Sequence, residues 1–345
     1  MTRLTYLSSS VAIAMAASPK IKASLPPGLI VQAGKTIWQT LWQVMMSRLA
    51  PSDEGGAYTR PTSEFRATVD STGSYQPAAK RYRLIVGMGC PWAHRTLMVR
   101  ALKGLEKAIP LWRVSPSPNE GIWLFDNPGL PWRSLPALYQ TAQPGYGGRS
   151  TVPVLWDTQT RTIVNNESAD LIQILNAAFN SFADRPQWDL YPSDQQATID
   201  HWSDRIYHAV NNGVYRCGFA RTQAAYEAAC TRLFETLDDI DQQLSTQRYL
   251  AGDRLTLADV RLFTTLFRFD AVYYGLFKCD RQRLRDYPHL WPYARDLYQQ
   301  PGVAATCDLD SVRRDYYGNL FPLNPGSIIP LGPNPQVWSQ PAQRG

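Results

Sequence analysis

LIVGMGCPWAHRT, at residues 84–96, joins a short apolar run to a helix start through two glycines, a cysteine and a proline. The run that ends at Val86 is typical of a strand covered on both faces, so we predict a strand over 82–87. Pro91 suits the first position of a helix, and apolar residues then recur at helical spacing until Gly104. We therefore predict a helix over 91–103, with Cys90 at the junction.

Cys90 occupies a position that favours a reactive thiol. Unpaired backbone N–H groups and the positive end of the helix dipole stabilise a thiolate there. His94 and Arg95 are expected to add positive potential, so we predict that the pKa of Cys90 falls below the free value of about 8.5. The alternative is a small structural hydrophobe, the commonest role of a free cysteine. Because the glycines, the proline and the helix start converge on Cys90, we favour a catalytic nucleophile.

The composition is that of a globular protein in a reducing compartment. A chain of 345 residues has room for two domains. Its five cysteines are odd in number, far apart and without metal-ligand spacing, so the sequence predicts neither a disulfide framework nor a metal. The net charge of +6 comes mainly from dispersed arginines without a recognition motif. This pattern argues against a nucleic-acid partner and suits anionic small molecules.

The sequence also argues against a membrane partner. Residues 11–17 resemble a minimal signal-peptide core, but only Arg3 precedes them, and we interpret them as part of an N-terminal extension. No apolar run approaches the ~20 residues that a transmembrane helix needs. We therefore expect a soluble, cytoplasmic protein.

Residues 80–180 follow a recognisable order of elements. Strands are predicted at 82–87, 109–114, 151–156 and 162–165, with helices at 91–103 and 167–178. A strand–helix–strand unit followed by a hairpin and a last helix is the thioredoxin-like plan. The loop 115–150 is rich in proline, glycine and tryptophan and is longer than a connection requires, so we expect it to serve a site.

The rest of the chain divides into three further parts. Residues 1–79 are predicted to form an N-terminal extension and arm, with a leading helix over 35–48. Residues 181–310 carry apolar residues at spacings of three and four with no strand signal, which predicts an all-helical domain. The tail 311–345 is rich in proline and glycine but apolar enough to pack back on the body. The predicted fold class is therefore α/β followed by all-α.

Thr151-Val152-Pro153-Val154-Leu155 is a strand with a proline inside it. Proline cannot donate a ladder hydrogen bond, so it must lie at an edge or in a special turn, and its peptide bond is a candidate for the cis isomer. In a thioredoxin-like fold this position faces the cysteine. The N–H and C=O of Val152 could then pair with an extended peptide ligand.

Glu167 and Ser168 stand at the predicted start of a helix. There, the Ser168 hydroxyl and free backbone N–H groups can hold a carboxylate, and Glu167 can hold an ammonium group. An amino-acid head group carries both charges. Ordinary helix capping is the alternative, and the glycosylation pattern at 166–168 is a weaker one.

Taken together, these motifs resemble one family. CPWAHRT (90–96), TVPVLWD (151–157), NNES (165–168), NNGVYRCGF (211–219), RRDYYG (313–318) and IIPLGP (328–333) resemble the glutathionyl-hydroquinone reductases, the Xi class of the glutathione transferase superfamily. The resemblance covers about 38–333 and leaves the role of the region before it open. It implies a thioredoxin-like N-terminal domain, an all-helical C-terminal domain and a homodimer. It also implies that glutathione reduces a glutathionyl-hydroquinone, releasing the hydroquinone and glutathione disulfide.

The same resemblance assigns roles to single residues. Cys90 would be the nucleophile and would form a mixed disulfide with glutathione, which a second glutathione resolves. The remaining assignments are Trp123, Arg149, Val152, Glu167 and Ser168 for binding glutathione, and Tyr215 and Tyr316 for the aromatic substrate.

Two other functions compete with this one. An omega-like thioltransferase or dehydroascorbate reductase also uses a cysteine at this helix start. A non-catalytic interaction module with the glutathione transferase fold would not need the complete set of Cys90, Val152, Glu167 and Ser168. The sequence does not identify the quinone or its pathway.

Overall fold

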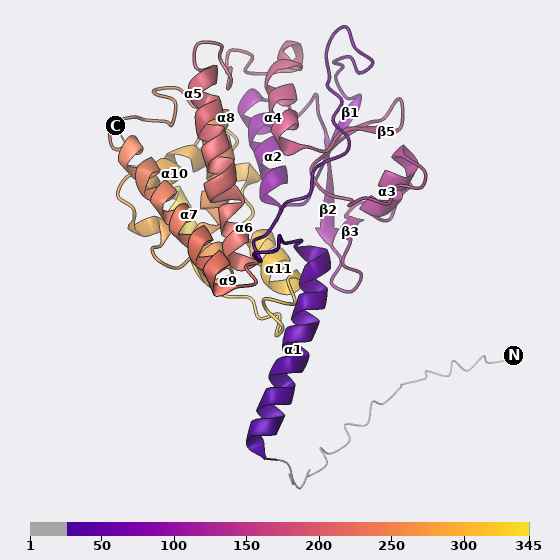
Figure 1. Ribbon diagram of the computed structural model, residues 1–345. Helices are drawn as coiled ribbons and strands as arrows, with labels where there is room; N and C mark the ends of the chain where they lie inside the picture. Colours follow the sequence, from indigo (N-terminus) through magenta and orange to yellow (C-terminus); the bar gives the residue numbers. More distant parts are fainter. Residues whose placement is uncertain (1–25, 345) are drawn as a thin grey trace, which may run out of the picture. The chain divides into compact units, whose positions relative to one another are not determined.

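Five strands form one mixed sheet in the order β3-β2-β1-β4-β5, and four of them, β1, β2, β3 and β5, are labelled in Figure 1. They are β1 Tyr82–Val86, β2 Leu111–Pro116, β3 Trp123–Phe125, β4 Val154–Asp157 and β5 Thr162–Asn165. Only β1 and β2 run parallel among these pairs, with Leu84 opposite Leu111, and β4 pairs antiparallel to β1. The computed structural model describes residues 26–344. The segment 11–17, with its resemblance to a signal-peptide core, lies outside them.

Helices α2 (Pro91–Lys103) and α4 (Ser168–Ala177) pack against each other beside the sheet. The predicted thioredoxin-like order is confirmed, and α2 has the predicted bounds. Gly104 ends α2 with a left-handed φ of 69°, which only glycine adopts without strain. β2 begins two residues later than predicted, at Leu111 rather than 109, and β4 begins at Val154 rather than 151.

The segment 115–150 is more regular than predicted. It contains β3, which pairs antiparallel with β2, and α3 (Leu135–Ala142), whose N-terminus is capped by the Ser134 hydroxyl at 3.4 Å from the Ala137 nitrogen. β3 adds a fifth strand at the β2 edge and places the Trp123 ring beside Gly87. The prediction of a loop over 115–150 is therefore wrong where β3 and α3 lie, because pairing with β2 organises a segment with little pattern of its own.

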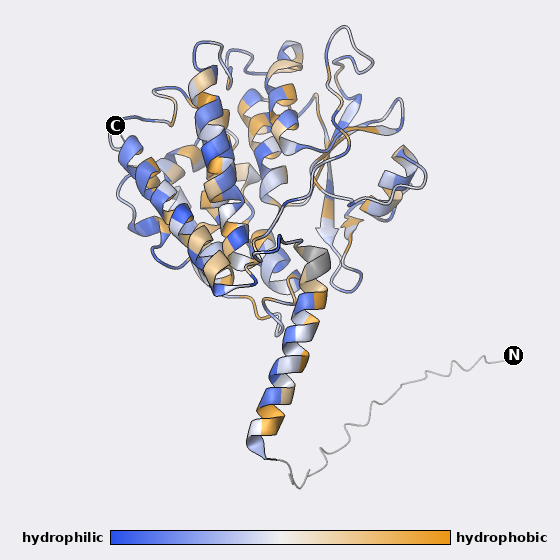
Figure 2. Cartoon of the chain, in the orientation of Figure 1, coloured by the Kyte–Doolittle hydropathy of each residue, from blue (hydrophilic) through white to orange (hydrophobic). Residues whose placement is uncertain are grey.

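Beyond β5 the described residues form helices and turns without a further strand. The helices are α5 Gln196–Ile206, α6 Gly213–Gly218, α7 Gln223–Leu244, α8 Leu257–Arg268, α9 Tyr274–Leu276, α10 Leu290–Tyr298 and α11 Leu309–Asn319. Most carry both hydrophobic and hydrophilic residues (Figure 2), whereas every residue of α8 is buried. This arrangement confirms the all-helical prediction and makes α8 the centre of the helical core.

Two π-helical turns interrupt the helical region, at Tyr207–Asn211 and Phe269–Tyr273. The first leads into α6 and the second into α9. Single π turns inside helices often occur at functional sites, because the extra residue re-aims the side chains that follow. Tyr215 and Tyr273 lie in or just after these turns.

The arm that precedes the sheet follows the edge of β5. The Ala67 N–H donates to the Val164 carbonyl at 3.0 Å, and the Asn166 N–H donates to the Phe65 carbonyl at 3.0 Å. These bonds cover a strand edge that would otherwise expose unpaired backbone groups. The predicted boundaries at 80, 181 and 311 stay predictions.

The tail packs on the helical region through Trp338, which is 4% exposed. Its ring contacts Phe267 at 5.2 Å and Trp291 at 4.9 Å between ring centroids. The Arg344 side chain also donates to the carbonyls of Leu244 and Gln247. Trp338 and Arg344 therefore contact the helical region, while the tail 311–345 as a separate part of the chain stays a prediction.

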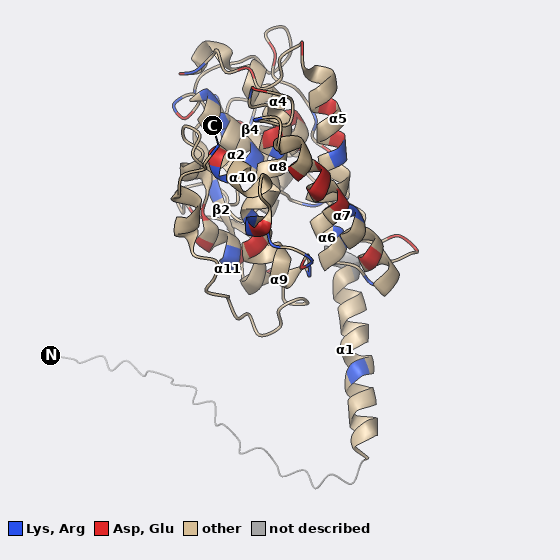
Figure 3. Ribbon diagram, turned by 90° about the vertical axis from the view of Figure 1, so that its left-hand side faces the viewer, with Lys and Arg blue, Asp and Glu red and all other residues tan. Residues whose placement is uncertain are grey.

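Helix α1 spans Pro27–Leu49 and therefore begins earlier than the predicted residue 35. The described residues before 46 form a unit separate from 46–344. In this unit Leu29, Ile30 and Ile37 are exposed. Among the α1 residues whose side chains are described, Lys35 carries the charge, in contrast to the mixed acids and bases elsewhere (Figure 3). Within residues 26–344, no helix combines the length and hydropathy required to cross a membrane.

Candidate functional site

Cys90 lies between β1 and α2, where it is the N-cap residue of the helix. Its Sγ is 3.6 Å from the carbonyl oxygen of Val152, and the Val152–Pro153 peptide bond is cis. The thiol is half-buried. The predicted juxtaposition of the cysteine and the proline turn is confirmed, and so is the cis isomer.

Both glycines before Cys90 are required by close approaches. A Cβ on Gly87 would lie 2.5 Å from the Trp123 ring, and a Cβ on Gly89 would lie 2.1 Å from a carboxylate oxygen of Asp315. The Gly89 N–H donates to that carboxylate at 3.1 Å. Gly87 therefore admits the tryptophan of β3, and Gly89 admits a carboxylate from α11.

The electrostatics of Cys90 differ from the prediction. Burial raises the pKa of the Cys90 thiol, while the Ala93 N–H, the charges of Arg60 and Arg268, and the Trp92 N–H oppose that rise. The helix start acts in the predicted direction, but desolvation of the thiolate outweighs it. The predicted lowering of the Cys90 pKa is therefore wrong for this structure, in which burial shifts the pKa in the opposite direction.

His94 supplies no charge to the thiol, contrary to prediction. It is 1% exposed, and burial, followed by the Arg268 charge, holds its pKa well below the usual value. Arg268 Nη1 lies 3.0 Å from His94 Nδ1, and Thr306 Oγ1 lies 3.0 Å from Nε2. Because a guanidinium can only donate, Nδ1 accepts and the neutral ring carries its proton on Nε2.

Arg95 also does not add the predicted positive potential at Cys90. It is buried, and its guanidinium donates to the Asn211 side chain and, at 3.5 Å, to the Ser168 hydroxyl. Its plane lies over the Trp92 ring at 4.4 Å. Arg95 therefore supports the start of α4, and Arg60 and Arg268 are the cations that act on Cys90.

A pocket of about 340 Å³ opens beside Cys90. Four of the predicted residues line it: Cys90, Trp123, Arg149 and Val152. Its opposite wall comes from the arm, through Tyr58, Arg60, Pro61, Thr62, Ser63 and Glu64. The Arg60 guanidinium sits 3.8 Å from the centre of the Trp92 ring. Sequence reasoning missed this wall, because an irregular polar segment gives no periodic signal.

Glu167 and Ser168 lie at the start of α4, as predicted. The Glu167 carboxylate accepts from the Ala169 N–H at 3.0 Å and from the Ser63 hydroxyl at 3.0 Å. Ser168 is buried, and its hydroxyl is 3.5 Å from the same carboxylate. Neither residue lines the 340 Å³ pocket, although Asn166 does. Glu167 caps its own helix here, so its role in binding stays a prediction.

Tyr215 and Tyr316 meet in the helical region. Their hydroxyl oxygens are 2.6 Å apart, and the Tyr273 hydroxyl lies 3.0 Å from that of Tyr316. Burial is the main cause that raises the pKa of all three phenols, so each keeps its proton at neutral pH. The family resemblance implied two of these tyrosines and did not include Tyr273.

The tyrosine cluster, defined as Tyr215, Tyr273 and Tyr316, is near Cys90 but does not line its pocket. Tyr58 connects the two, because its ring lines the pocket and lies 6.3 Å from the Tyr215 ring. The Cys90 thiol is close enough to affect the pKa of Tyr215 and Tyr273. The cluster can therefore donate hydrogen bonds on the helical side of the thiol.

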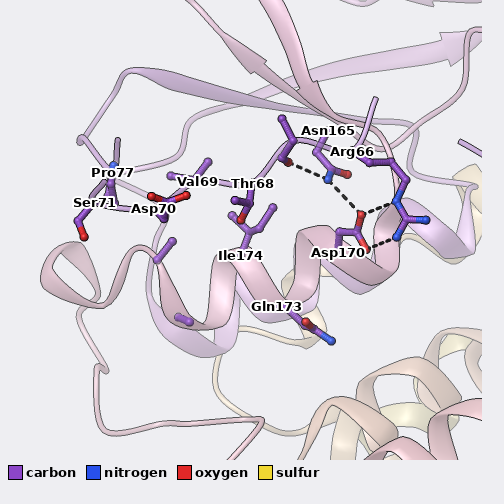
Figure 4. Close-up of a pocket in the computed structure, with 13 residues that line it drawn as sticks. Arg66, Thr68, Val69, Asp70, Ser71, Pro77, Asn165, Asp170, Gln173 and Ile174 are labelled. Carbon is purple, nitrogen blue, oxygen red and sulfur yellow. Dashed lines mark hydrogen bonds and ion pairs between the residues drawn. The ribbon is translucent and has the colours of Figure 1, made fainter. Parts of the chain in front are cut away.

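A larger pocket of about 590 Å³ lies along α4 (Figure 4). In it the Arg66 guanidinium binds Asp170 at 2.6 and 2.7 Å, and the Asn165 amide donates to the same carboxylate at 3.3 Å. These polar groups bind one another, and the lining residues include no cysteine, histidine or aromatic ring. The reactive groups therefore lie at the smaller pocket. No group of side chains suited to a metal occurs among residues 26–344.

Known protein families match both halves of this arrangement. Residues 89–178 match the glutathione S-transferase N-terminal domain, and residues 223–296 match its C-terminal domain. The glutathionyl-hydroquinone reductase YqjG of Escherichia coli is 43% identical over 314 residues, covering 86% of this chain and 93% of that protein. The glutathionyl-hydroquinone reductase PcpF of Sphingobium chlorophenolicum is 41% identical over 317 residues, covering 89% and 96%.

Solved structures agree with the sequence comparison. The glutathione-bound structure of YqjG has a TM-score of 0.77 at 43% identity and covers 81% of this chain and 96% of its own. The glutathione transferase Xi from Phanerochaete chrysosporium has a TM-score of 0.79 at 43% identity, covering 82% and 95%. Both similarities extend across the sheet and the helical region.

Proposed function

Since this chain belongs to the glutathionyl-hydroquinone reductases, the Xi class of the glutathione transferase superfamily, we propose that it reduces glutathionyl-hydroquinones through Cys90 with glutathione as cosubstrate. The observation that carries the proposal is the Cys90 thiol at a helix start, 3.6 Å from the Val152 carbonyl, at the floor of a pocket. The products are the hydroquinone and glutathione disulfide.

In the first step the Cys90 thiolate attacks the sulfur of the glutathionyl thioether. A sulfur–sulfur bond forms, the carbon–sulfur bond breaks, and its electron pair goes to the ring, whose carbon takes up a proton. A hydroxyl of the tyrosine cluster that donates to a ring oxygen stabilises the charge that develops there. The products of this step are the free hydroquinone and a Cys90–glutathione disulfide.

In the second step a second glutathione attacks the mixed disulfide. Its thiolate bonds to the sulfur of the bound glutathione, and Cys90 leaves as a thiolate. Over both steps the second glutathione supplies one proton and the ring carbon gains one. The ring is reduced by two electrons, and the thioether sulfur of one glutathione and the thiol sulfur of the other end as one disulfide.

The peptide part of glutathione is held by the residues around the pocket. The Val152 backbone pairs with the peptide, as one added strand would. Glu167 and Ser168 at the start of α4 bind its γ-glutamyl end, and Trp123 and Arg149 cover the remainder. Support for these roles comes from the pocket lining and from the Ser63 bond that ties Glu167 to the pocket wall.

The enzyme acts as a homodimer in the cytoplasm. A homodimer is typical of the superfamily, and light scattering during gel filtration measures it directly. The cytoplasm supplies reduced glutathione, and all five cysteines of the chain are free thiols in the structure. Fractionation of the native cell with an antibody checks the location.

A turnover assay tests the proposed chemistry. Glutathionyl-menadiol and free glutathione are the substrates, and release of the quinol and of glutathione disulfide is followed for the wild type and for Cys90→Ala. We expect the folded Cys90→Ala variant to lose the activity. Near-wild-type turnover by that variant would contradict the proposal, and faster reduction of dehydroascorbate than of the thioether would favour the omega-like alternative.

A further inference from the structure

The turn that presents Cys90 is held from outside the thioredoxin-like region. Arg268, the last residue of α8, donates through Nε to the Gly89 carbonyl at 2.9 Å and through Nη2 to the Met88 carbonyl at 3.1 Å. Asp315 of α11 accepts from the Gly89 N–H at 3.1 Å. Two helices from the helical region therefore bind both backbone polar groups of Gly89, the residue that precedes the nucleophile.

Arg268 is itself fixed in one geometry. It is fully buried, and its Nη1 also donates to the Thr264 carbonyl at 2.9 Å and to His94 Nδ1 at 3.0 Å. The His94 ring is neutral, so the guanidinium contacts carbonyl oxygens and a neutral nitrogen. A planar fork that binds four acceptors has little freedom to move. Its positive charge stays in the interior, where it favours a thiolate on Cys90.

The opposite side of the turn is equally constrained. Gly89 has no room for a side chain because of Asp315, and burial raises the pKa of Asp315 to about 6 against the effect of the Gly89 N–H. The carboxyl is therefore still mainly ionised at neutral pH. Asp315 also directly precedes Tyr316 of the tyrosine cluster. One helix thus contacts the nucleophile turn and carries a candidate substrate-binding hydroxyl.

We propose that Arg268 and Asp315 form a clamp on the Met88–Cys90 turn and that Arg268 is a positioning residue for the reaction of Cys90. The clamp holds the thiol toward the Val152 carbonyl. It also fixes the position of the turn relative to Tyr316, which follows Asp315 on α11. This inference rests on the proposed role of Cys90. It predicts that Arg268 affects the chemical step, although it does not touch the substrate.

The test measures the Cys90 thiol directly and turnover separately. The rate at which iodoacetamide modifies Cys90 is followed against pH by mass spectrometry of the Cys90 peptide. The charged and titratable groups that face the turn are Arg60 from the arm, Arg268 from α8, Tyr215 and Tyr273 from the helical region, and Asp315 from α11. Each single variant changes one of these groups and leaves the others in place.

For Arg268→Met we expect kcat to fall about a hundredfold with little change in the KM for glutathione, because the turn loses its orientation. The pH midpoint of alkylation should rise by about one unit or more, because a buried positive charge is lost. Arg268→Lys keeps the positive charge but loses the planar guanidinium that binds several acceptors at once. The pH midpoint of alkylation should therefore stay near that of the wild type, while kcat falls about tenfold. Asp315→Leu should lower kcat as well.

Arg295→Met is the matched control. Arg295 of α10 is also a buried arginine, lying over the Trp291 ring at 5.3 Å, and its loss should lower thermal stability without moving the alkylation midpoint. A folded Arg268→Met with wild-type kcat and midpoint would overturn the proposal. If Arg268→Met does not fold, a folded Arg268→Lys with wild-type kcat would overturn it. Failure of both to fold would make Arg268 a requirement of the fold and would also overturn it.

Alkylation separates this inference from the proposed function. If Cys90→Ala were active, the role of Cys90 in turnover would fail, yet the Arg268 variants would still report whether the clamp acts on the thiol. If Cys90 is essential but alkylation and kcat do not respond to Arg268, only the clamp fails.

Discussion

At the scale of single residues, the state of the Cys90 thiol decides how the enzyme responds to pH. Burial raises its pKa, so the thiolate fraction grows with increasing pH and is small at neutral pH. We therefore expect the rate of iodoacetamide modification at Cys90, without glutathione, to keep rising beyond about pH 8.5, the value for a free cysteine. A plateau reached below pH 7 would instead indicate a depressed pKa.

The tyrosine hydroxyls should matter for one class of substrate. In the variant Tyr215→Phe with Tyr316→Phe, release of the hydroquinone should fall about a hundredfold or more, because no phenol donates to the ring oxygens. Reduction of a small mixed disulfide of glutathione, which has no ring oxygen, should remain nearly intact. Both rates are measured on protein whose fold is verified by circular dichroism. Equal losses on both substrates would mean that the tyrosines serve packing.

Glu167 and Ser168 are expected to act on binding. Glu167→Ala and Ser168→Ala should weaken glutathione affinity more than they lower kcat, because both would contact the end of glutathione remote from its sulfur. Calorimetric titration with glutathione gives the affinity. Unchanged affinity in both variants would leave these residues as helix caps, a role that the Ala169 contact of Glu167 already supports.

The position of a site residue could be predicted from the sequence where that position depends on the residues next to it in the chain. The helix start at Cys90, the proline turn at Val152 and the cap at Glu167 each follow from neighbouring residues. The electrostatic partners could not be predicted in the same way. Arg268 is 178 positions from Cys90 in the chain, and nothing local distinguishes it from other arginines, whereas His94 and Arg95 are adjacent to Cys90 but buried elsewhere.

At the scale of elements, the junction between β1 and α2 depends on the absence of a side chain at Gly89. Gly89→Ala would bring a Cβ within 2.1 Å of Asp315, so the turn or α11 must shift. We expect this variant to lose about 1–3 kcal/mol of unfolding free energy and most of its turnover. Urea denaturation measures the loss. Gly147→Ala, where the added Cβ has open space, is the control and should be close to the wild type in both respects.

The bounds of a helix could be predicted where particular residues mark both of its ends. The short elements β3 and α3 could not be predicted. Pro91 and Gly104 mark the two ends of α2, so its bounds follow from the sequence. β3 has only three residues, too few for an alternating pattern, and it exists because β2 offers an edge. α3 begins at Leu135, next to a proline, inside a segment whose composition suggested irregular structure.

At the scale of the whole molecule, the tail contributes to stability through one side chain. Trp338→Ala should lower the unfolding free energy by about 3–5 kcal/mol, because a buried indole with aromatic neighbours leaves a cavity. Thermal unfolding of the full chain provides the measurement. Leu331→Ala, in the same tail but 96% exposed, is the control and should change little. If both variants have the unfolding free energy of the wild type, the tail does not stabilise the helical region.

The pocket wall formed by the arm allows substrate entry and catalysis to change independently. Its side chains belong to a short irregular stretch, 58–64, whereas the nucleophile belongs to the strand–helix unit that starts at β1. Irregular segments accept substitutions and insertions more readily than a buried strand. Exchange of this stretch between members of the family, with Arg60 kept, would therefore alter which quinones reach the thiol and leave both cations that act on Cys90 in place. A fragment that begins at residue 80 would lose this wall together with Arg60, one of the two cations that act on Cys90.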